Sequence, residues 1–590
     1  MTLELHTPYE RGNQNQTTTW EACIAFYETL HQQFPHILHF WQIGTSDAGI
    51  PMHAGVVTAD GVFNRDLLKQ RPIFFNNNGI HPGEPEGVDT CMALVRDFCT
   101  QPEILAQLGD TIFLFIPMYN VDGANNRNNT SRASQLGPEM HGFRGNSRHL
   151  DLNRDFIKCD TLAAQCFNRF FAEWQPDVMV DTHTSNGADY PYTMTLIATQ
   201  PDKLGGELGN FLRGTMLPAL QEKMTARGWP FCPFVNTVQV SPDQGIADFL
   251  EVPRFSSGYA TLHHTISFMP ETHMLKPYRD RYESMRALVE SALDFTIEHG
   301  AYIRTLREQA RAARAWRETL AGNDNQNGNH ESQNQQHGEV APSGGATFPV
   351  MWKMDSSRPT RLRFKGYAAV YKPSLLGNYQ RLAYDRNQPW EQEIDYFDNY
   401  VPEVEISTPR AYVIPQQWRE VVERLQWNGV HLQRLTEAKV VQAQTCRIER
   451  LDTRPGPYEG HMFHDEVGIT IQTETIQLHA GDWWLPMDAS QSAARYAFET
   501  LEPQAHDSFF RWGFFNSVLE KKEPFSDYVF EDEALEILQA EPELKARFEQ
   551  WKRDNPHLLD NQEAVLGFIF THCQRYAEPE WNRYPVLRIV

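Results

Sequence analysis

The feature that most constrains the fold is an alternation in the first 300 residues of short apolar runs and stretches with helical spacing. The apolar runs cover residues 72–75, 111–116, 177–181 and 265–269, and the helical stretches cover 87–100, 162–174, 203–227 and 278–316. Strands that alternate with helices predict an α/β domain whose sheet is mixed, largely parallel and flanked by helices.

Each apolar run is followed directly by a polar cluster. The clusters read NNNGIHPGE (76–84), PMYNVDG (117–123), THTSNG (182–187) and PETH (270–273). Ligands of parallel α/β domains bind beyond the carboxyl ends of the strands. The four clusters are therefore expected to meet at one edge of the sheet and to form one site.

The chain changes character after about residue 318. Residues 322–345 read GNDNQNGNHESQNQQHGEVAPSGG, which contains too few apolar residues to offset the entropy of ordering, and this predicts a flexible linker. We expect a catalytic domain over 1–318, a linker over 319–346 and an accessory domain over 347–590. Short alternating runs predict that the accessory domain is β-rich up to about residue 482 and helical after residue 490. The aromatic run over 509–515 is expected to be core.

Charge and composition exclude some classes of protein. The formal net charge of −23 argues against a nucleic-acid partner, and no apolar run is long enough to span a membrane. The eight cysteines are scattered without a CxxC pair, and the first residues do not resemble a signal peptide. These features favour the cytoplasm, although a secreted form with a removed signal peptide stays open. The oligomeric state is not indicated.

Three residues have the right chemistry for a catalytic zinc ion. His81 and Glu84 lie three positions apart in one turn, and His183 follows a strand of the same predicted sheet. Two imidazoles and one carboxylate form a known catalytic zinc set. The HxxE pattern alone is weak because it often arises by chance. Glu271 ends the fourth strand, where a carboxylate is either a capping group or an acid–base catalyst.

Arg144, Arg148 and Arg154 form a local basic cluster in an acidic chain. An anionic ligand would explain such a cluster. Salt bridges to Asp151 and Asp155 are the alternative explanation.

Five features follow one another along the chain: HPGE (81–84), YNVDG (119–123), DLNRDF (151–156), DTH (181–183) and the strand-terminal Glu271. Taken in this order, they resemble the zinc metallocarboxypeptidase family, which includes carboxypeptidase A. The resemblance covers roughly residues 20–300. Residues 44–52 also resemble the segment of that family in which the first hairpin of the fold lies.

The resemblance implies a role for each matching residue at the metal. His81, Glu84 and His183 bind one zinc ion, and Asp151 accepts a hydrogen bond from the other ring nitrogen of His81. Glu271 is the general base towards the zinc-bound water and then the proton donor to the leaving amine.

It also implies roles in substrate binding. Asn153 and Arg154 hold the terminal carboxylate of the substrate, and either Arg144 or Arg148 polarises the scissile carbonyl. Tyr259 is the candidate for the mobile tyrosine of the family, although it stands closer to Glu271 than is usual there.

The expected function is that of a zinc-dependent metallopeptidase, specifically a carboxypeptidase that hydrolyses the C-terminal peptide bond. Its partner would be a peptide or amino-acid conjugate with a free carboxylate. Two alternatives stay open at this point: a zinc amidase or deacylase acting on peptidoglycan peptides or small conjugates, and a non-catalytic peptide-binding protein on the same scaffold.

Overall fold

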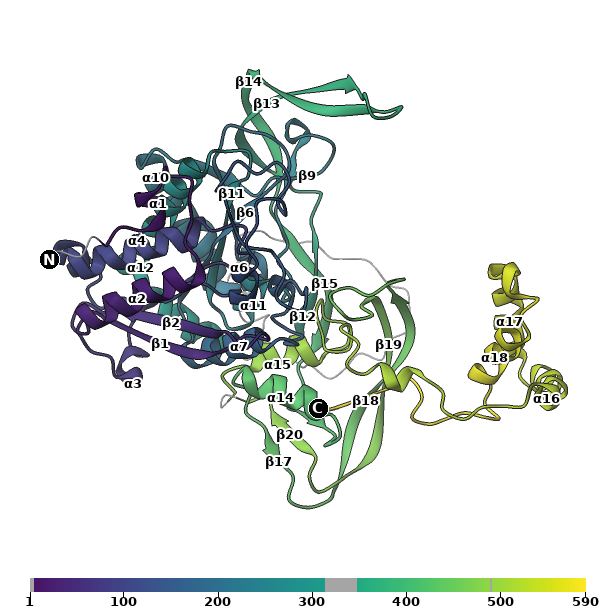
Figure 1. The fold of residues 1–590 in the computed structure, drawn as a ribbon. Helices are drawn as coiled ribbons and strands as arrows, with labels where there is room; N and C mark the ends of the chain where they lie inside the picture. Colours follow the sequence, from purple (N-terminus) through teal and green to yellow (C-terminus); the bar gives the residue numbers. More distant parts are fainter. Residues whose placement is uncertain (1–4, 313–346, 489–490) are drawn as a thin grey trace, which may run out of the picture.

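The structure is a computed structural model that describes residues 5–312, 347–488 and 491–590 (Figure 1). Its N-terminal part, residues 5–312, is built on one nine-stranded sheet. Eight strands lie in the order β1 (Leu38–Thr45), β2 (Pro51–Val57), β4 (Ile112–Ile116), β3 (Ile73–Asn77), β5 (Val178–Asp181), β11 (Ile266–His273), β7 (Met194–Ala198) and β8 (Phe231–Pro233), and β6 (His183–Ser185) pairs with β11.

The central strands β4, β3, β5 and β11 are parallel, whereas β1 is antiparallel to β2, β2 to β4, and β7 to β11. The prediction of a mixed, largely parallel α/β sheet is confirmed, and β1 and β2 form the first hairpin that the resemblance implied. The short strands β6, β7 and β8 were not predicted.

Helices cover both faces of this sheet. Alternation along β3 sends Phe74 into one apolar cluster, and Ile73 and Phe75 into another. The first cluster contains residues from α2 (Trp20–Gln33), α4 (Glu86–Thr100), α10 (Leu217–Ala226) and α12 (Tyr278–Ala312). The second contains residues from α7 (Leu162–Trp174) and α11 (Ser256–Leu262).

The helical stretch predicted over 203–227 is helical in most of its length but interrupted near its start. This stretch is divided into α8 (Pro201–Leu204), α9 (Gly206–Phe211), a π-helical turn over 212–216 and α10. Gly205 and Gly206 both have positive φ, at 77° and 57°, which breaks the helix between α8 and α9.

The C-terminal part, residues 347–488 and 491–590, is β-rich, as predicted. A six-stranded sheet has the order β17 (Gln433–Arg434), β20 (Trp483–Pro486), β16 (Ala411–Ile414), β21 (Arg583–Ile589), β18 (Lys439–Thr453) and β19 (His464–Leu478). A smaller pair joins β12 (Thr347–Met354) to β15 (Tyr400–Ser407). The long hairpin of β13 (Thr360–Pro373) and β14 (Gln380–Phe397) runs along the N-terminal part and pairs with β10 (Ile246–Ala247).

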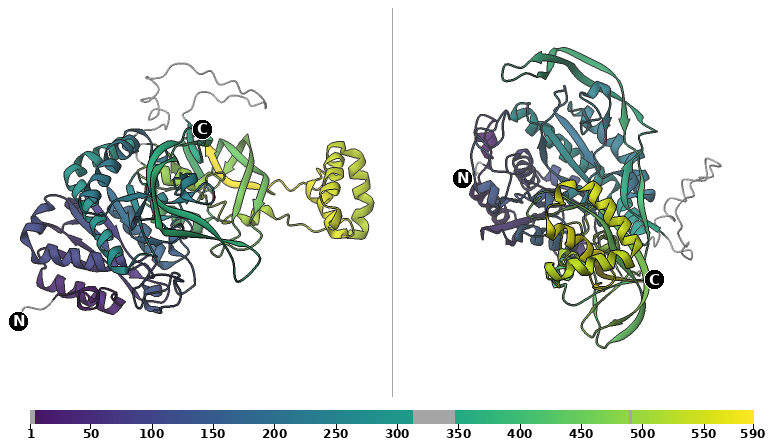
Figure 2. Two further views of the ribbon diagram at one scale, coloured as in Figure 1. Left: turned by 90° about the horizontal axis from the view of Figure 1, so that it is seen from above. Right: turned by 90° about the vertical axis from the view of Figure 1, so that its right-hand side faces the viewer.

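Helices follow the strands, also as predicted. These helices are α15 (Ala494–Leu501), α16 (Asp527–Ala540), α17 (Pro542–Asp554) and α18 (Gln562–His572), while α14 (Arg419–Trp427) precedes β17. Helices α16 to α18 have their own apolar cluster and extend away from the rest of the molecule (Figure 2). The chain then returns to the six-stranded sheet as β21, which the sequence reasoning missed.

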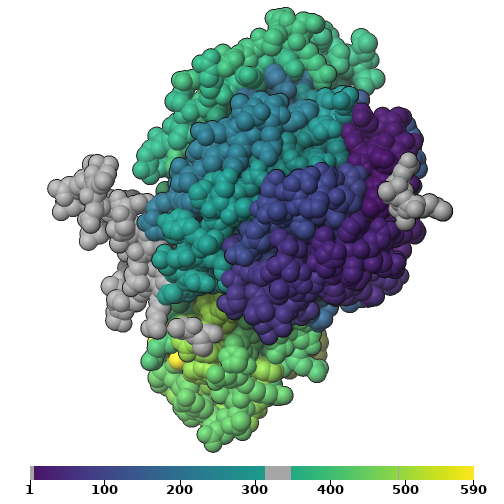
Figure 3. Space-filling view, turned by 90° about the vertical axis from the view of Figure 1, so that its left-hand side faces the viewer, coloured from purple at the N-terminus to yellow at the C-terminus, as the bar shows by residue number. Residues whose placement is uncertain are grey.

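The two parts share a core. The cluster under α7 and α11 continues into the C-terminal part, where Tyr496, Phe509 and Trp512 are fully buried. In the space-filling view, C-terminal segments flank the N-terminal part at two opposite ends (Figure 3). The predicted linker, residues 319–346, lies outside the described residues. Within the described ranges, no helix has the length and apolar character needed to cross a membrane.

Candidate active site

The three candidate metal ligands meet at the carboxyl edge of the central strands. His81 and Glu84 lie in the turn after β3, and His183 begins β6 just after β5. One potential ligand atom from each residue lies within 4.8 Å of the others. All three side chains are buried, with 2–3% of their surface exposed.

Both imidazoles are oriented by a carboxylate on the far side of the ring. His81 Nε2 lies 2.8 Å from Asp151 Oδ1, as the resemblance implied, and His183 Nε2 lies 2.9 Å from Asp181 Oδ2. The Nδ1 atoms therefore face Glu84, at 3.3 Å for His81 and 3.1 Å for His183. Asp181 was not singled out from the sequence, although its place two residues before His183 was the available signal.

The cluster fits a metal ion. His81 Nδ1 is buried and has no hydrogen-bond partner, which is costly unless another group uses its lone pair. Two imidazoles and one carboxylate leave a fourth position open in a tetrahedral site, and carboxylates behind the rings are the usual support of such ligands.

Arg132 is a site residue that the sequence reasoning missed. It donates from Nη1 to Glu84 Oε1 at 2.6 Å and from Nη2 to the carbonyl of Thr184 at 2.9 Å. Burial alone would raise the pKa of Glu84, but Arg132, His81 and His183 together hold it well below its usual value. Glu84 is therefore ionised, as a metal ligand must be. The position of Arg132 in an irregular loop gave no local signal.

Glu271 lies beside the cluster. It sits on β11 directly opposite His183 in the pairing with β6. Burial, and then the negative charge of Glu84, raise the pKa of Glu271 to about 8. The carboxyl of Glu271 can thus gain or release a proton near neutral pH.

Glu271 and the metal cluster line one cavity of about 470 Å³. Its walls combine charged groups with apolar side chains. The lining includes His81, Glu84, Arg132, Arg144, Asn153, Arg154, His183, Ile197, Phe234, Phe249, Phe255, Met269 and Glu271.

The structure distinguishes Arg144 from Arg148, which the sequence did not. Arg144 lines the cavity and donates from Nε to Asp151 Oδ2 at 3.0 Å. Arg148 points elsewhere: its Nη1 donates to the carbonyl of Asp160 at 2.8 Å and lies 3.5 Å from Asp47. Arg148 is not among the residues that line the cavity.

Asn153 and Arg154 also line the cavity. Asn153 Oδ1 accepts a hydrogen bond from the backbone N–H of Ser256 at 3.0 Å. The Arg154 guanidinium lies over the ring of Phe255, at 4.4 Å from its centroid, and donates from Nε to Tyr458 Oη at 3.1 Å. Tyr458 belongs to the C-terminal part and was not predicted.

The structure does not bring Tyr259 to the site. Its ring is fully buried in α11, packed against Phe156 and Phe171, and its hydroxyl donates to Asn428 Oδ1 at 2.7 Å. A side chain fixed in the core in this way cannot swing towards a substrate in the cavity. The expectation that Tyr259 binds substrate is corrected accordingly.

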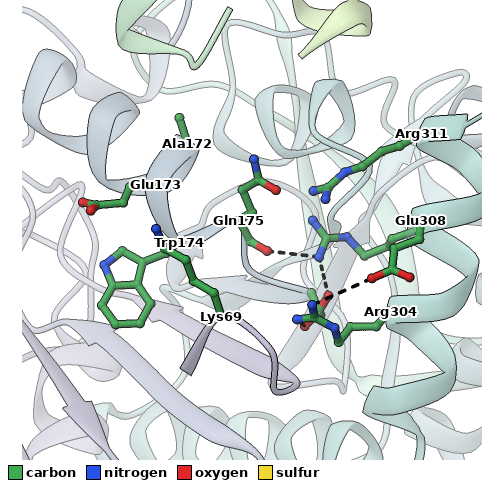
Figure 4. Close-up of a pocket in the computed structure, with 10 residues that line it drawn as sticks. Lys69, Ala172, Glu173, Trp174, Gln175, Arg304, Glu308 and Arg311 are labelled. Atoms are coloured by element: carbon green, nitrogen blue, oxygen red, sulfur yellow. Dashed lines mark hydrogen bonds and ion pairs between the residues drawn. The ribbon is translucent and has the colours of Figure 1, made fainter. Parts of the chain in front are cut away.

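A second cavity, of about 310 Å³, lies beside the other end of the strands (Figure 4). It is lined by Arg304, Arg307 and Arg311 of α12, and by Asp177 just before β5. None of the predicted site residues lines it. The buried ion pair between Arg307 and Asp177 instead ties the end of α12 to the sheet.

Comparison with known proteins identifies a segment of the N-terminal part. Residues 23–192 match the family model described as zinc carboxypeptidase. Residues 23–192 therefore form a domain of the zinc carboxypeptidase family. The matched residues include His81, Glu84, Arg154 and His183, and the donor set described above suits the zinc ion of that family.

Relatives and solved structures bear related names. The chain is 32% identical to carboxypeptidase 2 of Trichophyton tonsurans over 111 residues, which is 18% of this chain and only 19% of the relative. It is 21% identical to carboxypeptidase 2 of Trichophyton equinum over 462 residues, 74% of this chain and 72% of the relative. The metallo-carboxypeptidase from Burkholderia cenocepacia is 16% identical, with a TM-score of 0.35 over 48% of this chain and 69% of its own.

Proposed function

We propose that this protein is a zinc-dependent carboxypeptidase that hydrolyses the C-terminal peptide bond of a peptide. One observation above all supports this activity: Glu271 lines the same cavity as the three candidate metal ligands and three arginines, Arg132, Arg144 and Arg154. The cavity thus combines a metal site, an acid–base group and anion-binding groups. The names of the relatives favour a peptidase over an amidase or deacylase.

In this proposal His81, Glu84 and His183 hold the zinc ion. When bound, zinc would act as a Lewis acid that polarises the scissile carbonyl and lowers the pKa of water. Glu271 accepts the proton of the attacking water and passes it to the leaving amine. Asp151 and Asp181 keep the two imidazoles in the orientation that metal binding needs.

Two arginines bind the negative charges of the substrate and of the oxyanion. Arg154, supported by Asn153, binds the terminal carboxylate of the substrate, because a guanidinium matches that planar anion. Arg144 stabilises the oxyanion, since it lies in the cavity wall within 3.5 Å of Glu84, whereas Arg148 faces Asp47.

The apolar wall indicates which C-terminal residues are accepted. The apolar side chains that line the cavity are Ile197, Phe234, Phe249, Phe255 and Met269. Burial of an apolar side chain against such a wall is favourable, whereas an unpaired charge would be costly. We therefore infer a preference for substrates with a large apolar C-terminal residue.

We further infer a location in a reducing compartment such as the cytoplasm. All eight cysteines are free thiols, and all but Cys166 are buried. Disulfides form and persist in oxidising compartments. Cell fractionation with an antibody against the protein would check this location.

The activity is tested with N-blocked dipeptides that end in phenylalanine. We expect release of free phenylalanine from the dipeptide with a free C-terminus, loss of this activity with a chelator, and recovery on addition of zinc. The same dipeptide amidated at its C-terminus should be cleaved far more slowly, and one that ends in lysine should be a poorer substrate. Activity that resists zinc removal, or equal cleavage of the amidated peptide, would contradict the proposal.

A further inference from the structure

The C-terminal part reaches the candidate carboxylate site through one turn. Residues 458–461 form this turn between β18 and β19, and we refer to it as the 458–461 turn. Tyr458 Oη accepts a hydrogen bond from Arg154 Nε at 3.1 Å, and Glu459 Oε2 accepts one from the backbone N–H of Asp151 at 2.9 Å. Tyr458 and Glu459 thus contact the two ends of the DLNR segment (151–154).

These contacts leave Arg154 with one unoccupied end. Nε is held by Tyr458, Nη1 donates to the carbonyl of Asn153 at 2.8 Å and lies 3.9 Å from Asp151 Oδ2, and Cζ lies over the ring of Phe255 at 4.4 Å from its centroid. Among the described residues, no acceptor contacts Nη2. Contacts at Nε, at Nη1 and at the ring of Phe255 therefore hold the guanidinium in place, with Nη2 available to an incoming anion.

The 458–461 turn is itself held rigidly. Tyr458 and His461 exchange two backbone hydrogen bonds, of 2.8 and 3.0 Å. The rings of Tyr458 and Trp512 stack with their centroids 5.9 Å apart. The two ring nitrogens of His461 lie 2.6 Å from Asp160 Oδ2 and 2.7 Å from the carbonyl oxygen of Trp512. A turn fixed to both parts of the molecule can hold Arg154 without first being ordered itself.

We propose that Tyr458 is a positioning residue for substrate binding, through which the C-terminal part orients Arg154 towards the terminal carboxylate of the substrate. This inference rests on the proposed carboxypeptidase function. An arginine that is already oriented loses less conformational freedom when it binds an anion, so the binding of free carboxylates should be tighter. The C-terminal part would then complete the substrate site of the N-terminal part.

The central test is Tyr458→Phe, which removes the hydroxyl and keeps the ring against Trp512. We expect KM for the free dipeptide to rise about three- to tenfold, as for the loss of one hydrogen bond, while kcat stays within about twofold of the wild type. The constant for competitive inhibition by L-phenylalanine should rise to the same extent, and that for L-phenylalaninamide should not change. Tyr528→Phe is the matched control, because Tyr528 is 84% exposed on α16.

The outcomes separate the possible explanations. If the wild-type protein cleaves no peptide, the proposed function fails. If it is active and Tyr458→Phe has wild-type KM and inhibition constants, the positioning role fails. A fall in melting temperature and zinc content with equal losses for both inhibitors would mean that Tyr458 is only structural, and this would also overturn the inference.

Glu459 provides an independent check on the same turn. Glu459→Gln keeps an oxygen that can accept from the Asp151 N–H, whereas Glu459→Ala removes it. Because Asp151 orients His81, we expect the alanine variant to lose zinc to a chelator several times faster, and the glutamine variant to behave as the wild type. Equal zinc loss in the wild type and both variants would contradict a role of the turn in supporting the DLNR segment.

Discussion

At the scale of single residues, the site depends on carboxylates that the chain holds in very different environments. Glu84 is kept ionised by Arg132 and two imidazoles, whereas burial raises the pKa of Glu271 to about 8. The same residue type can therefore serve as a metal ligand and as an acid–base group within one cavity.

Glu271→Gln should abolish most of the peptidase activity, because glutamine cannot accept the proton of the attacking water. We expect kcat to fall about 10²- to 10⁴-fold with an unchanged zinc content. Steady-state kinetics and elemental analysis measure the two quantities. The control is Glu308→Gln, since Glu308 is 66% exposed on α12. A glutamine variant that keeps its activity would show that another residue is the general base.

Asp181→Asn should weaken zinc binding. Asp181 is fully buried, and its Oδ2 contacts His183 Nε2 at 2.9 Å, so the negative charge orients and polarises the imidazole. We expect the affinity for zinc to fall about 10- to 100-fold in competition with a fluorescent chelator. Asp243→Asn, at an exposed position, should leave the affinity unchanged. An unaltered affinity in the Asp181 variant would show that the ligand needs no such support.

At the scale of elements, the site residues lie at the ends of strands, and helices pack against the sheet that these strands form. The sequence predicted strands close to β3, β4, β5 and β11, and also α4, α7 and α12, because their apolar periodicity is set by local packing against one sheet. It did not predict β6, β7 and β8, which are short and owe their pairing to β11 or to one another.

The ion pair between Asp177 and Arg307 should stabilise this arrangement. Both side chains are at most 3% exposed, and Asp177 Oδ2 also accepts from the backbone N–H of Ile73 at 2.9 Å. Asp177→Ala leaves a buried charge unpaired, so we expect the free energy of unfolding to fall by about 3–5 kcal/mol in urea denaturation.

Glu308→Ala is the control for this experiment, because Glu308 lies on the same helix and lines the same cavity (Figure 4). Its exposed carboxylate should contribute less than about 0.5 kcal/mol. Equal effects of the two substitutions would mean that the buried pair does not hold α12 to the sheet.

At the scale of the whole molecule, the N-terminal and C-terminal parts form one packed body. They share an apolar cluster, the pairing of β10 with β14, and the hydrogen bond from Tyr259 to Asn428. The division into a domain over 1–318, a linker over 319–346 and a domain over 347–590 stays a prediction, and these contacts argue against two independently folding units.

Cutting the chain between the two parts should therefore not separate them. We expect that a protein with a protease site introduced within 319–346 elutes after cleavage as one complex in size-exclusion chromatography, because the shared core stays buried. In urea the fragments should come apart together with the loss of peptidase activity. Separation of the fragments in native buffer would contradict a shared core.

The sequence by itself determined the fold class of the N-terminal part and the identity of the metal cluster. The residues His81, Glu84 and His183 stand directly after apolar strands, and the alternation of strands and helices brings the ends of those strands together. Only the tertiary structure decided that Arg144 faces the cavity while Arg148 and Tyr259 do not, and that Tyr458 meets Arg154 across about 300 residues of chain. Local spacing fixes where a backbone runs, whereas the direction of a long side chain and its distant partners depend on how whole elements pack.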